Sequence, residues 1–220
     1  MKPYLPLLLL AACTVVAPPA RQGADSSDWY RQSFAAGAPV YAVSPADSVI
    51  AVTVRRAGLL ARLGHDHVVA SRAIHGFAAP DAARADIAFR ADELTVDEPG
   101  LLREAGVPTR PSAQDIEGTR TNMLTHVLDA KRYTEIRLQA TRVAPGRLSV
   151  AITLHGVSRS VDLPCAIETG PGQVSASGAL TLRQTDFGIT PFAVGGGLLA
   201  VEDEVEVRFR IVARRWDGRP

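Results

Sequence analysis

The chain has 220 residues, of which 46% are hydrophobic, 21% charged and 5% aromatic, a composition typical of one globular domain. Lys and Arg number 24 against 23 Asp and Glu, so the net charge is +1 and no basic block stands out. This balance argues against a nucleic-acid binder, which needs a concentrated cationic face. Two cysteines exclude a disulfide scaffold and a thiolate-rich zinc site. No apolar run reaches the ~20 residues needed to span a bilayer.

The first residues have the layout of a secretory signal peptide. Lys2 precedes an apolar stretch that ends in the small-residue run Leu10-Ala11-Ala12-Cys13. This run resembles the lipobox of bacterial lipoproteins, and the resemblance implies cleavage before Cys13 and acylation of its thiol. We therefore expect a signal peptide over residues 1–12 and a membrane anchor at Cys13, on the periplasmic side of a bacterial envelope. Thr14 after the cysteine favours the outer membrane over the inner one. An apolar segment with an incidental cysteine is the alternative.

The next segment, residues 13–39, is rich in Ala, Pro, Gly, Ser and Asp and shows no periodicity. Such a composition predicts a flexible tether. Alternatively, Trp29, Tyr30 and Phe34 pack on the domain or contact the membrane surface. The folded domain is expected over residues 40–214, followed by a C-terminal tail over residues 215–220.

From Val40 onward the dominant hydrophobic period is two residues. Apolar and polar side chains alternate over residues 148–154 and 204–211, as a half-buried antiparallel strand requires. Similar strands are predicted over residues 48–56, 67–77, 85–96, 133–143, 157–168 and 173–183. Long strands in up-and-down order close most economically into a barrel, because closure removes exposed edges. The predicted fold is therefore all-β, with an eight-stranded antiparallel barrel.

One segment departs from this pattern and predicts an α-helix. Ser112 and Asp115 have the spacing of a helix capping box. The apolar residues that follow fall on one helical face: Ile116, Met123, Leu124, Val127 and Leu128. We expect this one helix to lie over a mouth or a flank of the barrel.

Three segments, in chain order, resemble the YceI-like family of lipid-binding, lipocalin-like proteins. They are residues 123–138, which contain Tyr133-Thr134-Glu135-Ile136, residues 152–161 (ITLHGVSRSV) and residues 182–189 (LRQTDFGI). The last has one extra residue between arginine and aspartate, and Thr134 stands where the family usually has proline. The resemblance implies an extended, lipocalin-like, eight-stranded barrel with a helix. It also implies a tunnel for a polyisoprenoid or fatty acyl chain.

The apolar halves of the strands would line such a tunnel, because an eight-stranded barrel can hold one small ligand. The candidate ligand-binding residues are Ile136, Leu138, Val150, Ile152, Leu154, Phe187, Val205, Val207, Phe209 and Ile211. Periodicity alone leaves open whether they line a cavity or form a solid core.

A second candidate site is the run His65-Asp66-His67. On a strand, His65 and His67 would face the same side, so both imidazoles could reach one divalent metal ion. His75, His126 and His155 are further candidate ligands. The alternative is that His65 and His67 cap a turn and bond to backbone carbonyls or to Asp66.

The remaining chemistry-bearing residues predict structural roles. Cys165 is expected to be a buried, inert thiol, and Arg183 is expected to pair with Asp186. No nucleophile elbow, His-Glu-x-x-His motif or phosphate loop occurs, so no catalytic residue is assigned. The sequence thus predicts a membrane-anchored carrier for an apolar isoprenoid or acyl lipid, with no required cofactor. Two alternatives are a metal-dependent or redox-linked protein that uses His65 and His67, and a structural or stress-linked envelope protein with a filled barrel.

Overall fold

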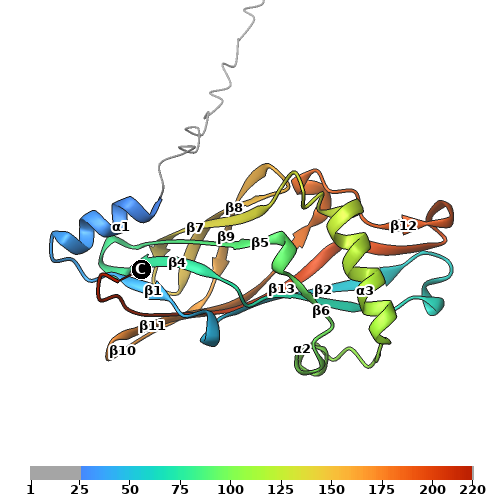
Figure 1. Ribbon diagram of the computed structural model, residues 1–220, viewed down its shortest axis with the longest axis horizontal. Coiled ribbons are helices and arrows are strands. Elements are labelled where there is room, and N and C mark those ends of the chain that lie inside the picture. The colour runs from blue at the N-terminus through green and yellow to red at the C-terminus, as the bar shows by residue number, and fades with distance from the viewer. Residues whose placement is uncertain (1–25, 220) are drawn as a thin grey trace, which may run out of the picture.

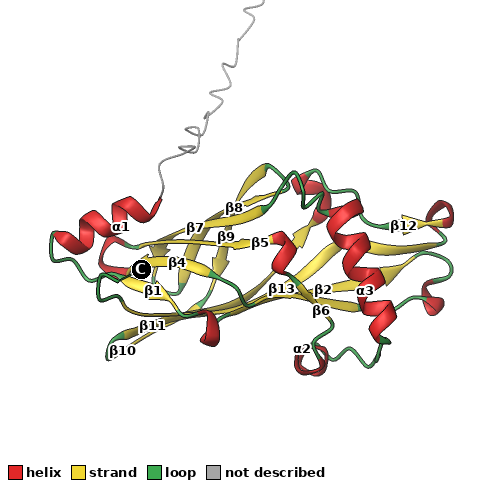
Figure 2. Ribbon diagram, in the orientation of Figure 1, coloured by secondary structure: helices red, strands yellow, loops and turns green. Residues whose placement is uncertain are grey.

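The computed structural model describes residues 26–219, and antiparallel strands dominate this part of the chain (Figures 1 and 2). The predicted signal peptide and Cys13 lie outside the described residues. The strands are β1 (Tyr41–Val43), β2 (Val49–Ala57), β3 (His67–Ser71), β4 (His75–Ala79), β5 (Arg84–Arg90), β6 (Thr95–Val96), β7 (Glu135–Ala144), β8 (Arg147–Leu154), β9 (Val157–Pro164), β10 (Ala166–Gly170), β11 (Gln173–Arg183), β12 (Ala193–Val194) and β13 (Leu199–Arg215).

The described helices are few and peripheral (Figure 2). The α-helices are α1 (Ser26–Ala35), α2 (Pro99–Glu104) and α3 (Ala113–Asn122), and α3 continues directly into a π-helical turn over Met123–Val127. Short 3₁₀ turns cover Pro45–Asp47, Ala61–Leu63, Pro80–Ala82, Ala91–Glu93, Gln184–Phe187 and Gly195–Gly197.

All 13 strands belong to one sheet, with the main order β6-β3-β2-β13-β1-β4-β5-β7-β8-β9. The long strand β13 organises it, because β11 pairs along one edge while β2 and then β1 pair along the other. Strands β9 and β11 come close without forming a ladder: a Cβ on Gly178 would lie 3.0 Å from the Pro164 carbonyl oxygen. The prediction of an antiparallel all-β fold is confirmed. The closed eight-stranded barrel is not, because the sheet has 13 strands and is open.

The strand count differs because predicted strands are interrupted where the chain changes partners. The predicted strand 67–77 becomes β3, which pairs with β2, and β4, which pairs with β1 and β5. The predicted strand 157–168 is broken at Cys165, whose N–H donates to the Gly146 carbonyl at 2.9 Å. Strands β1 and β12 are too short to show an alternating pattern in the sequence.

The predicted helix is confirmed, together with its capping box. The Ser112 hydroxyl accepts from the Asp115 N–H at 3.2 Å, and the Ser112 N–H donates to the Asp115 carboxylate at 3.0 Å. Helix α3 and its π-helical turn lie across the sheet (Figure 1). The expectation of one helix is wrong, because α1 and α2 also form. Leu101 and Leu102 of α2 are buried on β3, so packing rather than a local signal accounts for this short helix.

Helix α1 shows that the prediction of a flexible tether is wrong for residues 26–39. Tyr30 is fully buried, its ring stacks on Phe77 and its hydroxyl donates to Asp86 at 2.7 Å. Burial, together with this hydrogen bond, raises the pKa of the Tyr30 phenol. Trp216, in the predicted tail, packs in the same cluster against Phe34 and Phe77. These aromatic contacts fix α1 beside the C-terminal end of β13, at one end of the long axis (Figure 1).

Candidate functional site: an apolar cavity with one mouth

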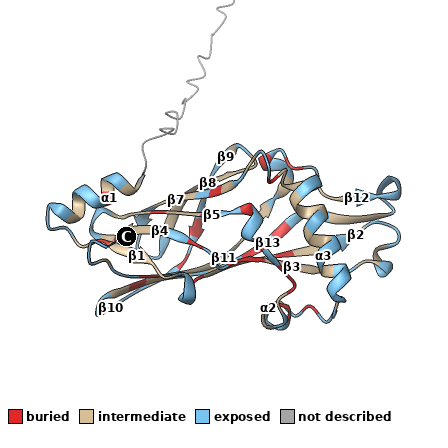
Figure 3. Ribbon diagram, viewed as in Figure 1, coloured by how far each residue is buried: buried red, intermediate tan, exposed pale blue. Residues whose placement is uncertain are grey.

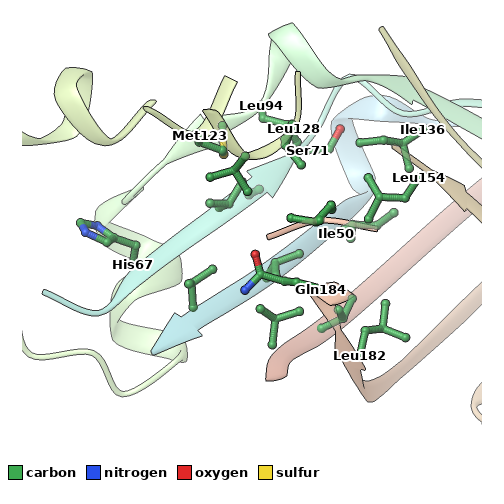
Figure 4. A pocket seen from close by; sticks show the side chains of 18 of the residues that line it. Ile50, His67, Ser71, Leu94, Met123, Leu128, Ile136, Leu154, Leu182 and Gln184 are labelled. Atoms are coloured by element: carbon green, nitrogen blue, oxygen red, sulfur yellow. The ribbon is translucent and has the colours of Figure 1, made fainter. Parts of the chain in front are cut away.

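The sheet and α3 enclose a cavity of about 510 Å³, a volume within the range of small-molecule sites. Its wall combines inward-facing side chains of β2, β3, β5, β7, β8, β11 and β13 with Met123, Val127 and Leu128 that follow α3. Figure 4 shows side chains from several of these elements converging on one space. Their inward direction follows from the two-residue period of the strands, because alternate side chains leave opposite faces.

Nine of the ten predicted ligand-binding residues line this cavity. They are Ile136, Leu138, Val150, Ile152, Leu154, Val205, Val207, Phe209 and Ile211. Phe187 does not: it is buried in a cluster with Cys165 and Ile189, of which Ile189 itself lines the cavity. It lies in a 3₁₀ turn after β11, where no strand alternation fixes the direction of its side chain. Whether the nine residues contact a ligand remains a prediction.

The space between the strands is hollow, because side chains that point into it remain partly exposed. Leu154, Leu180 and Leu182 line the cavity and pack against the core, yet they are only partly buried. Figure 3 shows buried residues mainly on the strands, with intermediate and exposed ones towards the β12 end. A barrel filled end to end by its own side chains would bury these leucines completely. The alternative of a filled barrel therefore does not match the structure.

The cavity has its mouth at one end of the molecule. Among the described residues that line it, the exposed ones are Arg56, His65 and Val194. Arg56 and His65 flank the loop between β2 and β3, and Val194 ends β12. These loops lie at the opposite end from α1 (Figure 1). The lining residues near α1, such as Ala85 and Ala176, are at least partly buried.

The polar groups of the cavity are concentrated towards this mouth. The Nδ1 atom of His67 lies 2.7 Å from the carboxylate of Asp97, whose side chain is fully buried. The same carboxylate accepts from the Val68 N–H at 2.8 Å, so the Asp97 carboxylate fixes the imidazole ring. Gln184 donates to the Glu202 carbonyl at 2.8 Å, and Asn122 of α3 also lines the cavity. His67 was predicted as a site residue, whereas Asp97, Gln184 and Asn122 were not, since their proximity depends on the fold.

The residues that the structure describes supply no third ligand to complete a metal site at His65 and His67. The rings of His65 and His67 are 6.3 Å apart between centroids, and no group of three or more His, Cys, Asp or Glu side chains with metal-binding geometry occurs within residues 26–219. Asp66 instead pairs with Arg55 at 3.3 Å and accepts from the Arg56 N–H at 3.0 Å. Of the alternative in which His65 and His67 bond to backbone carbonyls or to Asp66, the bond from the His67 Nδ1 atom to Asp66 is not formed, because the partner of this atom is Asp97.

The other assignments are partly corrected. Arg183 pairs with Asp203 at 3.0 Å, so the predicted pair with Asp186 is wrong. The reason is that the β11 ladder brings Arg183 towards residue 204 of β13, next to Asp203. Cys165 is a buried free cysteine, as predicted, and burial raises the pKa of its thiol. A raised pKa lowers the thiolate fraction and with it the reactivity.

An open antiparallel sheet that encloses an apolar cavity, with a few polar groups at one mouth, defines a class of binding protein for apolar ligands. No helix within the described residues is long and apolar enough to cross a bilayer. Residues 41–213 match the YceI-like domain, and the chain belongs to the YceI-like family.

Comparison with solved structures supports the fold. A polyisoprenoid binding domain from Saccharophagus degradans, implicated in plant cell wall breakdown, is similar with a TM-score of 0.57 and 12% identity, over 80% of this chain and 98% of that one. BcnA of Burkholderia cenocepacia is similar with a TM-score of 0.52 and 14% identity, over 78% of this chain and 99% of that one. No curated protein matches the sequence. At these identities the likeness concerns the fold alone.

Proposed function

We propose that this protein binds and carries an apolar isoprenoid or acyl lipid in the cavity. The observation that carries the proposal is the cavity itself, about 510 Å³ with a wall that is mostly apolar. Transfer of each methylene group from water into such a wall contributes about 0.8 kcal/mol, so a long hydrocarbon chain supplies ample binding energy. The similar S. degradans domain is described as polyisoprenoid binding, which agrees with this ligand class.

The polar residues at the mouth would hold the head group of the lipid. With Nδ1 engaged by Asp97, His67 has Nε2 left to bond with a hydroxyl, carbonyl or phosphate group. Asn122 and Gln184 add amide donors and acceptors to the cavity lining. In this arrangement the hydrocarbon chain lies between the strands and its polar end remains near solvent. Binding needs no cofactor and no bond is made or broken.

A membrane anchor at Cys13 and a periplasmic location, with the outer membrane favoured, complete the proposal. Both rest on the lipobox-like run that ends at Cys13 and on Thr14. A Cys13→Ser variant should lose the acyl mass and partition into the aqueous phase of a detergent extract. Unchanged partitioning and mass would refute the anchor without affecting the proposal on the cavity.

The test of binding is native mass spectrometry of the protein after purification from a bacterial host and incubation with long-chain isoprenoid alcohols. We expect a bound species of defined mass, and only bare protein would refute the proposal. Leu180→Gln and Thr181→Gln form a matched pair, because Leu180 lines the cavity and its neighbour Thr181 is exposed. An amide in the apolar wall loses hydrogen bonds to water when lipid enters, which costs about 1–3 kcal/mol. Leu180→Gln should therefore weaken binding by about fivefold to about 150-fold, while Thr181→Gln leaves it unchanged.

A further inference from the structure

Large exposed apolar side chains gather at one place on the described surface. Six such residues occur within residues 26–219, and five of them lie on the two loops at the mouth. Leu59 is 88% exposed and Leu63 is 72% exposed, so both project almost fully into solvent. We define the tip surface by these five residues: Leu59, Leu60, Leu63, Val194 and Leu198. Clustered exposed apolar side chains mark interaction sites, whereas scattered ones are ordinary.

The two loops form one continuous unit, although almost 140 residues separate them in the sequence. The Leu60 N–H donates to the Leu198 carbonyl at 2.9 Å, and Ala57 pairs with Ala200 in the β2–β13 ladder. A Cβ at Gly58 would come within 2.6 Å of the Leu198 carbonyl oxygen, and its φ of +90° favours glycine as well. The close approach of the loops is therefore built into the backbone.

The tip surface surrounds the mouth of the cavity. Ala61 and Gly64, beside the exposed leucines, line the cavity, and so do Val194 and Leu199 of the second loop. The apolar lining thus continues onto the outer surface through these residues, beside the polar side chains of Arg56 and His65. Figure 1 shows both loops at the end of the molecule that is remote from α1.

The charge around the tip surface also restricts its partner. Residues 57–64 and 190–200 contain no Asp or Glu, and their ionisable side chain is Arg62, which is exposed. The loops are aliphatic and rich in glycine, with Gly195–Gly197 at the second turn. Such loops offer few hydrogen-bonding side chains, and their one aromatic residue, Phe192, lines the cavity and is partly buried, so it is not an exposed anchor of the kind that dominates protein interfaces. They suit the acyl boundary of a bilayer, where one cation also favours anionic head groups.

We propose that the tip surface docks on a lipid bilayer, with its leucines inserted in the interface and the mouth facing the membrane. This inference rests on the proposed function, because it supplies the route by which the lipid enters. A chain that leaves the bilayer directly into the cavity avoids exposure of its apolar surface to water, which would otherwise oppose transfer. Docking through the tip surface is separate from the proposed anchor at Cys13 and does not require it.

The test compares how variants of the protein bind to lipid vesicles. All of them lack residues 1–12 and carry Cys13→Ser, so no acyl group contributes to binding. Residues 26–219, and with them every described contact, are retained. The vesicles contain zwitterionic lipid with a minor fraction of anionic lipid, and bound protein is measured by co-sedimentation. Leu59→Ser with Leu63→Ser should weaken binding at least about tenfold. Val143→Ser is the control, because Val143 is the sixth exposed apolar residue and lies off the tip surface, at the end of β7. It should leave binding unchanged.

Val194→Ser with Leu198→Ser, on the other loop, should reproduce the loss independently, so one misfolded variant cannot decide the outcome. Equal sedimentation of the wild type and both tip variants, or no sedimentation of the wild type, would overturn the inference. So would a wild-type dimer that the tip substitutions convert to a monomer without any vesicle binding, because the partner would then be a second copy.

Failure of the docking inference is distinguishable from failure of the proposed function. Isoprenoid alcohol delivered from cyclodextrin bypasses the membrane, and loading is then read by native mass spectrometry. If the tip variants load normally from cyclodextrin but slowly from vesicles, both proposals are supported. If the wild type loads from cyclodextrin yet never sediments with vesicles, the docking inference alone is refuted. If it fails to load from either source, the proposed function is refuted.

Discussion

The end of the cavity near α1 should act as a ruler for the length of the bound chain, and Ala176 is the residue with which to test this. Ala176 of β11 lines the cavity and lies opposite Ile211 of β13, towards the end at which Gln173 pairs with Arg214. A phenylalanine at this position would fill the end near α1 and leave the mouth unchanged. It should exclude about one isoprene unit, whose five carbons contribute up to about 4 kcal/mol when buried.

Ala176→Phe should therefore discriminate by chain length. In a titration with isoprenoid alcohols of increasing length, the affinity for the longest chain should fall at least tenfold, up to about a thousandfold for a fully excluded unit. The affinity for the shortest chain should stay unchanged. Ala179→Phe is the matched control, since Ala179 is on the same strand but exposed, opposite Arg208. A uniform loss for all lengths, or an equal effect in the control, would show that the ligand does not extend towards Ala176.

Three further predictions concern the framework around the cavity. Tyr30→Phe removes the hydrogen bond to the buried Asp86 carboxylate but keeps the buried ring. The free energy of unfolding in urea should therefore fall by about 2 kcal/mol, and an unchanged value would mean that this bond does not stabilise the domain. The hydroxyl of Ser71 is buried without a hydrogen-bond partner in the described structure. Ser71→Ala should therefore raise the urea concentration at the midpoint of unfolding and should not weaken lipid binding. A loss of affinity would show that the hydroxyl bonds to the ligand. Hydrogen bonds from the hydroxyl and the N–H of Thr185 lower the pKa of Asp203 below its usual value of 3.8. The ionised carboxylate therefore stabilises the folded state at neutral pH, and this stabilisation disappears as the pH falls through the lowered pKa. Urea unfolding should show Asp203→Asn less stable than the wild type at pH 7 and the difference shrinking below about pH 4; a difference independent of pH would refute this assignment.

Local patterns in the sequence were sufficient for features that depend on neighbouring residues. The alternation over residues 204–211 gives the inward direction of Val205, Val207 and Phe209, because the period of a strand fixes the face of each side chain. The spacing of Ser112 and Asp115 likewise gives the start of α3, since a capping box is formed within one turn.

Features that depend on contacts distant in the sequence were not predictable from such patterns. The Tyr30–Asp86 bond joins residues 56 apart, and the His67–Asp97 bond joins residues 30 apart. Neither pair has a periodic or motif-like signal, so α1 was interpreted as tether and His67 as a metal ligand. The break before His75 has the same origin: the apolar pattern continues, but the chain leaves one strand partner for another.

The contrast between the two ends of the cavity follows from how the wall is built. Backbone hydrogen bonds between strands set the separation of the walls, so the side chains determine how much of the enclosed space is filled. Near α1, the small side chains of Ala85, Ala140 and Ala176 leave room, while the aromatic cluster around Tyr30 covers the adjoining outer surface. At the mouth, the loops carry their large apolar side chains outward instead of inward. A protein can accept a long hydrocarbon chain end-on when it has space at one end of the cavity and an apolar opening at the other. Different residues should therefore determine the length of the bound chain and the contact with the membrane.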